Sequence, residues 1–152
     1  MMDIGALKTI HVLSACLFLG NVIVSGTWAA MAERTRNHQI IQFSNRLVLI
    51  TDLLFTLTGA LGVIITGSMM AQAYGGSSNH GWISWSYLLF GLSGLIWALV
   101  LFPIQLKQRV LLRRHDHITS EYLRLSRVWQ ISGAVATALP LPIIYLMINK
   151  SF

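Results

Sequence analysis

The sequence predicts an all-α integral membrane protein, a single four-helix bundle, from two observations. Of its 152 residues, 55% are hydrophobic and only 11% are charged, whereas charged residues make up about 25% of an ordinary soluble domain. The apolar residues are concentrated in four stretches, each long enough to cross the roughly 30 Å of hydrocarbon as a helix, at about residues 7–31, 47–71, 85–106 and 128–148. Little chain remains between these stretches, so we expect one transmembrane domain over residues 1–152, surrounded by lipid.

The basic residues predict how this bundle is oriented. Nine of the eleven Lys and Arg residues lie in the connections between the first and second stretches and between the third and fourth. The remaining connection, "YGGSSNHGWIS", has none, and only Lys8 and Lys150 lie on its side. Because loops rich in Lys and Arg stay in the cytoplasm, we expect both termini on the outer, periplasmic side of a bacterial inner membrane. The net charge of +6 is then a topology signal and gives no indication of nucleic-acid binding.

The first stretch carries a histidine where lipid offers no hydrogen-bond partner. Six of its residues recur at spacings of three and four and therefore share one helix face: His11, Ser14, Phe18, Asn21, Ser25 and Trp28. Nearly every polar group of the helix lies on this face, which we expect to point into the bundle. Three roles remain open for His11. It bonds a neighbouring helix, it ligates a haem or a metal ion, or it handles protons.

Other potential ligands are expected at the same end of the bundle as His11. His80 lies in the connection without basic residues, Met69 and Met70 end the second stretch, and Met147 ends the fourth. A pair of imidazoles suits a low-spin haem, whereas histidine with methionine suits copper(I), which prefers soft ligands.

The second stretch contains Asp52 about six residues after Arg46, in "RLVLITDLLFTLTGALG". A buried carboxylate is costly unless it is paired or protonated. Gln130, at a comparable depth in the fourth stretch, is the expected partner, in a structural polar pair between the second and fourth helices. A proton path or a ligand site on the inner side is the alternative. Asp52 heads one helix face formed by Asp52, Thr56, Gly59, Val63, Thr66 and Met70.

Glycines and prolines predict local features of the remaining helices. Gly59, Gly62 and Gly67 in the second stretch allow close approach of a neighbouring helix. Pro140 and Pro142 predict a kink in the outer half of the fourth. The sequence contains no G-x-S-x-G, H-E-x-x-H, phosphate loop or dinucleotide fingerprint, so whether the protein is an enzyme stays open, and any chemistry would be that of a cofactor.

Three segments of the chain carry a further signal: "TDLLFTLTGALGVIITG", "LFPIQLKQRV" and "RVWQISGAVATALPLPIIYLMINK". With them, nearly the whole chain resembles a family of small bacterial integral membrane proteins known as domain of unknown function 2269. Phe102 stands where the family pattern has a tryptophan before the proline. The family name implies a membrane bundle and no activity.

More distantly, "KTIHVLSACLFLGN" is similar to the first helix of two other four-helix groups, the haem-dependent membrane protoporphyrinogen oxidases and the copper-resistance D proteins. The first resemblance implies a haem b ligand at His11, with Lys8 beside it. The later stretches have no internal basic residue where that group keeps one, so haem binding is implied rather than protoporphyrinogen oxidation.

These observations lead to three hypotheses. The first is a b-type haem-binding protein that transfers electrons or oxidises a small membrane-soluble substrate near the outer face. His11 would be one axial ligand and His80 the second, with Met147 or Met70 as the fallback, and Ser14 and Asn21 would line the site. The second is a copper-handling membrane protein. The third is a non-catalytic subunit that docks a larger membrane complex, and a redox partner or homo-oligomer is possible for each.

Overall fold

The computed structural model describes residues 3–73, 75–76 and 80–149 and contains helices and no strand in these ranges. Four long helices follow one another, and three of them are interrupted. The first is α1 (Ile4–Arg34), and the second combines α2 (His38–Thr51), the π-helical η1 (Asp52–Thr56) and α3 (Leu57–Ala73). The third combines α4 (Gly81–Ile96), the π-helical η3 (Trp97–Leu101) and α5 (Phe102–Arg114), and the fourth α6 (Ser120–Ala138) and α7 (Leu141–Asn149).

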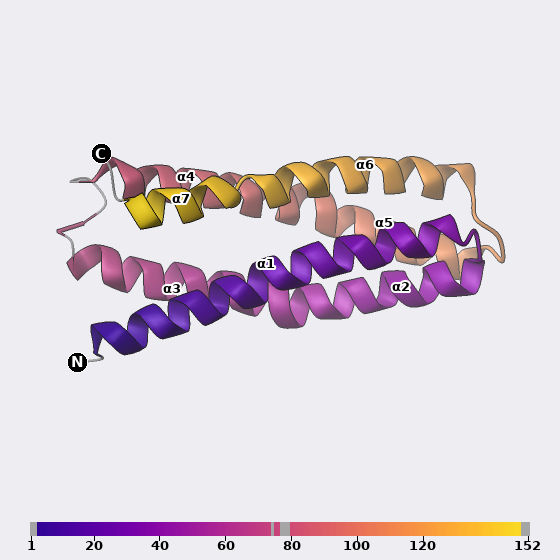
Figure 1. Cartoon of the computed structure of the whole chain (residues 1–152). Helices are drawn as coiled ribbons and strands as arrows, with labels where there is room; N and C mark the ends of the chain where they lie inside the picture. Colours follow the sequence, from indigo (N-terminus) through magenta and orange to yellow (C-terminus); the bar gives the residue numbers. More distant parts are fainter. Residues whose placement is uncertain (1–2, 74, 77–79, 150–152) are drawn as a thin grey trace.

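All four helices are long and apolar enough to cross a membrane, which confirms the predicted four-helix membrane fold. They run alternately up and down, and both termini lie at the same end of the bundle (Figure 1). We call that end, where α1 begins and α7 ends, the terminal end. The opposite end, with the turns at 35–37 and 115–119, is the basic end, because the Lys and Arg residues of those connections lie there.

The turns at the basic end are defined by side-chain caps. Asn37 Oδ1 accepts hydrogen bonds from the backbone N–H groups of Gln39 (2.9 Å) and Ile40 (3.3 Å), and so starts α2. The hydroxyl of Thr119 accepts from the N–H of Tyr122 at 3.1 Å and starts α6. These residues satisfy N–H groups that the first turn of a helix leaves without partners.

The interruptions have local causes. α6 ends at Ala138 and α7 begins at Leu141, because Pro140 has no N–H to continue the helix. This confirms the predicted break. The π turn η3 ends at Leu101, two residues before Pro103, whose ring would crowd the carbonyl four residues earlier in a regular α-helix. The other π turn, η1, begins at Asp52, and π turns often mark functional positions in helices.

The bundle is more polar inside than outside. Its buried residues include His11, Asp52, Thr66, Gln105 and Gln108. Large apolar side chains such as Leu13, Phe43, Ile65, Leu99 and Ile148 are exposed on its outer surface. This is the distribution expected where lipid surrounds the protein and polar groups must find partners internally.

The helices pack as two pairs that meet most closely toward the basic end. α1 lies along the whole of α2, η1 and α3, while α4 packs against α6 and α7. α2 contacts α5, and α1 contacts α6. Toward the terminal end, α1 and α3 diverge from α4 and α7 (Figure 1). The divergence opens the interior at the level of His11.

Candidate functional site

The contact between α1 and α3 is a close backbone approach made possible by glycine. A Cβ atom added at Gly59 would lie 2.9 Å from both the backbone N of Phe18 and the carbonyl oxygen of Ser14. One added at Gly62 would collide with the Ser14 side chain. The two polar faces predicted for these helices therefore face each other. Trp28 is the exception, since 39% of its surface is exposed.

At the terminal end of this contact, His11 bonds across to α3. Its Nδ1 lies 2.9 Å from the hydroxyl oxygen of Thr66. That hydroxyl donates its own proton to the carbonyl of Gly62 at 2.6 Å, so its oxygen accepts from His11. The proton of a neutral imidazole is therefore on Nδ1, and Nε2 retains its lone pair.

The orientation of the ring agrees with this assignment. A Cβ atom at Gly67 would meet His11 Cε1 at 3.2 Å and Nδ1 at 3.7 Å. The Cε1–Nδ1 edge thus faces α3, and the Val63 carbonyl on that helix is a further acceptor for the ring. His11 therefore makes the predicted hydrogen bond to a neighbouring helix through Nδ1. Its Nε2 is left for the second predicted role, as a ligand of a haem or a metal ion.

His11 lines a largely apolar cleft between the two helix pairs, which we call the terminal cleft. Its volume is about 310 Å³, at the lower end of the range of about 300–1,000 Å³ for small-molecule sites. The lining residues come from α1, α3, α4 and α7: Lys8, His11, Val12, Val63, Ile64, Gly67, Met70, Ala71, Trp82, Ile83, Ser86, Tyr87, Phe90, Ile143 and Met147.

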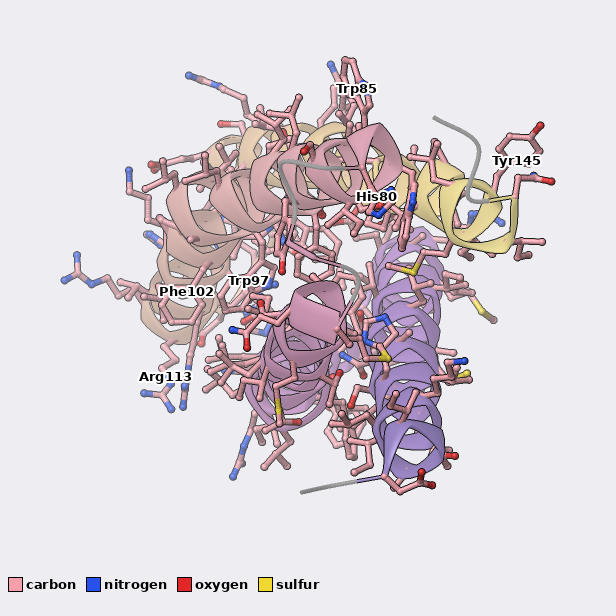
Figure 2. The ribbon with its side chains drawn as sticks, turned by 90° about the vertical axis from the view of Figure 1, so that its left-hand side faces the viewer. His80, Trp85, Trp97, Phe102, Arg113 and Tyr145 are labelled. Carbon is pink, nitrogen blue, oxygen red and sulfur yellow. The ribbon has the colours of Figure 1, made fainter. Side chains whose placement is uncertain are left out.

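The structure brings some of the predicted ligands together and leaves others apart. Met70 and Met147 line the terminal cleft with His11. His80 does not line it. It is the residue directly before α4, and its ring centroid lies 6.3 Å from that of Trp82, which lines the cleft. Figure 2, viewed from the terminal end, shows His80 at the near end of α4 and Trp85 and Tyr145 pointing away from the bundle. Met69 is 44% exposed and absent from the cleft.

Two residues predicted to line a cofactor site lie elsewhere. Ser14 contacts Gly62, and Asn21 bonds the Asp52 carboxyl, so neither lines the terminal cleft. Both lie on the same face of α1 as His11, but on the side of His11 toward the basic end this face packs directly against the second helix. At His11 the helix pairs are far enough apart to leave the terminal cleft between them.

A second polar site surrounds Asp52, which is 4% exposed. Its Oδ1 accepts from Asn21 Nδ2 at 3.2 Å and from the Thr56 hydroxyl at 3.1 Å. Its Oδ2 accepts from Gln105 Nε2 at 2.7 Å. Asn21 Nδ2 also donates to Thr56 at 2.9 Å. Three neutral residues from α1, η1 and α5 thus provide the partners that a buried carboxyl requires.

The predicted pair of Asp52 with Gln130 is wrong. Gln130 Nε2 donates instead to Glu33 Oε2 on α1, at 2.6 Å. Residue counting placed Asp52 and Gln130 at similar depths, but the rotation of α6 directs Gln130 toward the end of α1. Gln105 takes the expected role, and the sequence reasoning missed it. Its spacing of three from Gln108, in "PIQLKQR", places both amides on one helix face and was the available signal.

Trp97 has no hydrogen-bond partner for its buried indole N–H in the part of the chain that the structure describes. It lies inside the bundle (Figure 2) and shares a groove with Asp52 and Gln105. The Asp52 carboxyl is nonetheless close enough to interact with the Trp97 indole. No group of three or more His, Cys, Asp and Glu side chains suitable for a metal ion occurs among the described residues, so a metal at the terminal cleft would rely on histidine and methionine.

The fold and these two sites define a multi-pass integral membrane protein with a polar interior. The chain belongs to the family described as "Predicted integral membrane protein (DUF2269)", whose model matches residues 5–151. The family predicted from the sequence is thereby confirmed. No curated protein and no solved structure matches the chain.

Proposed function

We propose that the terminal cleft binds b-type haem, with Nε2 of His11 as an axial ligand. The observation that carries this proposal is the bond from His11 Nδ1 to Thr66, because it fixes the tautomer with a free lone pair on Nε2. A hydrogen bond to the other nitrogen is the usual support of a ligating histidine.

The surroundings of His11 fit the group. The cleft is apolar and about 310 Å³ in volume, whereas a bare ion needs no such space. Met70 and Met147 line it and offer a thioether as the second axial ligand. Lys8 is exposed at the same end and provides a cation for a propionate. His80, beside Trp82, is the other candidate for the second ligand.

Haem bound in the cleft would supply one-electron chemistry. The chain itself orients the His11 ring through Thr66 and excludes water with apolar walls from four helices. We infer electron transfer, or oxidation of a small membrane-soluble substrate, in a bacterial inner membrane with the basic end in the cytoplasm. The nine basic residues at that end support this orientation.

Copper(I) handling is the second candidate. One imidazole and two thioethers line the same cleft, and this donor set suits copper(I). It predicts that metal binding depends equally on His11, Met70 and Met147, whereas haem needs His11 and one further ligand.

Absorption spectra of the detergent-purified protein, oxidised and dithionite-reduced, test the proposal. We expect a Soret band and sharp reduced bands in the wild type and their loss in His11→Ala. Thr66→Val should weaken haem retention, since it removes the support of the ligand. Thr58→Val is the matched control, because that exposed hydroxyl bonds only the Leu54 carbonyl of its own helix.

The other outcomes decide between the candidates. A colourless protein with stoichiometric copper, lost in His11→Ala and in Met147→Ala, would replace haem with copper. A protein from haem-replete cells that contains neither haem nor copper would refute both.

A further inference from the structure

A small internal cavity lies between the basic end and Asp52. Its volume is about 20 Å³. Three buried polar atoms that lack hydrogen-bond partners in the described part of the chain belong to residues lining it, namely Ser44 Oγ, Gln105 Oε1 and Trp129 Nε1. A cavity needs roughly 10–15 Å³ and two to four polar partners to hold one water molecule. The size and the unpartnered atoms therefore both point to a bound water, which would accept from Trp129 and donate to Gln105.

On the side of the basic end, this cavity meets Glu33. Glu33 lines the cavity and also a crevice of about 600 Å³ that includes Arg34 and Arg36. Its Oε2 accepts from Gln130 at 2.6 Å, and it interacts with the hydroxyl of Tyr122. The Glu33 carboxyl is thus placed between the crevice and the buried cavity.

On the inner side, the cavity meets the Asp52 site through one side chain. Gln105 is 1% exposed and lines the cavity. The same amide donates from Nε2 to Asp52 Oδ2 at 2.7 Å, while Oε1 has no partner in the described chain. A single amide therefore separates a water-sized space from the buried carboxyl.

We propose that Glu33, the cavity water and Asp52 form a proton path from the basic end to the middle of the bundle, with Gln105 as its gate. A proton leaves the Glu33 carboxyl for the cavity water, and that water passes a proton to the Asp52 carboxylate. Water in the crevice then reprotonates Glu33, and the reverse sequence releases the proton. Because an amide does not relay protons, Gln105 must swing off Asp52 so that water reaches Oδ2.

The path ends at Asp52. Beyond it lies a cavity of about 70 Å³ with mainly apolar walls, including Phe18, Leu57 and Phe90. The hydroxyl groups that line it, Thr56 and Ser93, already donate to Asp52 and to the carbonyl of Ala136. Asp52 also lines the groove along α1 and α6 that contains Arg34 and Leu141. Among the described residues, this groove shares no lining residue with the terminal cleft, and the apolar cavity shares with it only the apolar side chain of Phe90. This inference is independent of haem or copper binding.

The groups that face Asp52 from the packed elements leave its charge uncompensated. Asn21 of α1, Thr56 of η1 and Gln105 of α5 are neutral partners. Trp97 of η3 adds an indole, and Arg34 lies farther along the groove that Asp52 shares with α6. On the path itself the titratable groups are Glu33 and Tyr122. A change in the protonation of Asp52 should therefore alter the resonances of the neutral amides that bond it.

NMR of the full chain, labelled with ¹⁵N and placed in lipid nanodiscs, tests the proposal. We expect the indole N–H of Trp129, assigned with Trp129→Phe, to show a cross-peak to water. The side-chain amides of Asn21 and Gln105 should shift with pH in the wild type, and these shifts should be lost in Asp52→Asn. Ser44→Val should fill the cavity and remove the water contact of Trp129.

A matched substitution at the other end is the control. The Ser86 hydroxyl bonds the Trp82 carbonyl of its own helix at 2.7 Å, so Ser86→Val should leave the Trp129 signal unchanged. A wild-type Trp129 N–H without contact to water would show that the cavity is dry and overturn the proposal. If Trp129 contacts water but the amide resonances of Asn21 and Gln105 show no shift that depends on Asp52, the water is purely structural and the proposed path is refuted.

Discussion

The close backbone approach of α1 to α3 predicts a graded response to alanine at four glycines. At Gly59 an added Cβ would lie 2.9 Å from two backbone atoms of α1, and at Gly62 it would meet the Ser14 side chain. At Gly67 it would lie 3.2 Å from His11, and at Gly91 it would meet nothing within 4 Å. The Ser14 hydroxyl can rotate away from a new methyl group, but backbone atoms can move only with their helix, and so can Ser14 Cβ, which would lie 2.9 Å from the methyl group at Gly62.

Gly59→Ala should therefore separate α1 from α3. Ordinary carbon–oxygen contacts lie at about 3.3–3.6 Å, so the two helices must move apart by roughly 0.5 Å. Overpacking of this kind costs about 1–3 kcal/mol, against a gain of up to about 1 kcal/mol from replacing glycine by alanine in a helix. We expect a net loss of about 1–2 kcal/mol at Gly59 and a similar loss at Gly62, a smaller loss at Gly67, where only the His11 ring has to shift, and none at Gly91.

Unfolding of each variant by increasing dodecyl sulfate in mixed lipid micelles, followed by circular dichroism, measures these differences. Gly91→Ala is the control, since it makes the same chemical change on an open face. Equal stability of Gly59→Ala and Gly91→Ala would refute the close approach of α1 and α3.

Two further predictions concern polarity and exposure. Asp52→Leu should destabilise the bundle by about 2 kcal/mol in the same unfolding assay, because it removes three hydrogen bonds worth about 0.6 kcal/mol each in a membrane. Asp52→Asn should cost less, because Gln105 can turn its unpartnered Oε1 to accept from the new amide; similar losses for the two variants would contradict this account. Cys16 is an exposed side chain on the outer face of α1, so Cys16→Leu should change the free energy of unfolding by no more than about 0.5 kcal/mol in the same assay; a loss of several times that size would place Cys16 inside the bundle.

The two polar sites share one helix contact and differ in what surrounds them. His11 and Asn21 lie on the same face of α1, and both bond the helix formed by η1 and α3. At His11 the other helix pair has moved away and leaves a cleft, whereas at Asp52 α5 closes the site with Gln105. The contact of α1 with the second helix therefore borders an open cleft near His11 and encloses a buried carboxyl at Asp52.

The sequence by itself determined the membrane fold and the two interior faces. The four apolar stretches predict the helices. The spacing of polar residues predicts that His11 and Asp52 face the interior, and the proline pair predicts the kink before α7. These features are local, because hydrophobic length, helical periodicity and the missing N–H of proline act within one segment of the chain.

Only the tertiary structure decided which interior residues meet. The rotation of the packed helices decides that Asp52 bonds Gln105 and not Gln130, and that His11 bonds Thr66. Their divergence decides that Met70 and Met147 line one cleft with His11, whereas His80 does not. Rotation follows from where glycines allow backbones to touch, and divergence from how the two pairs cross. Both are properties of contacts between distant segments, so residue spacing within one segment does not determine them.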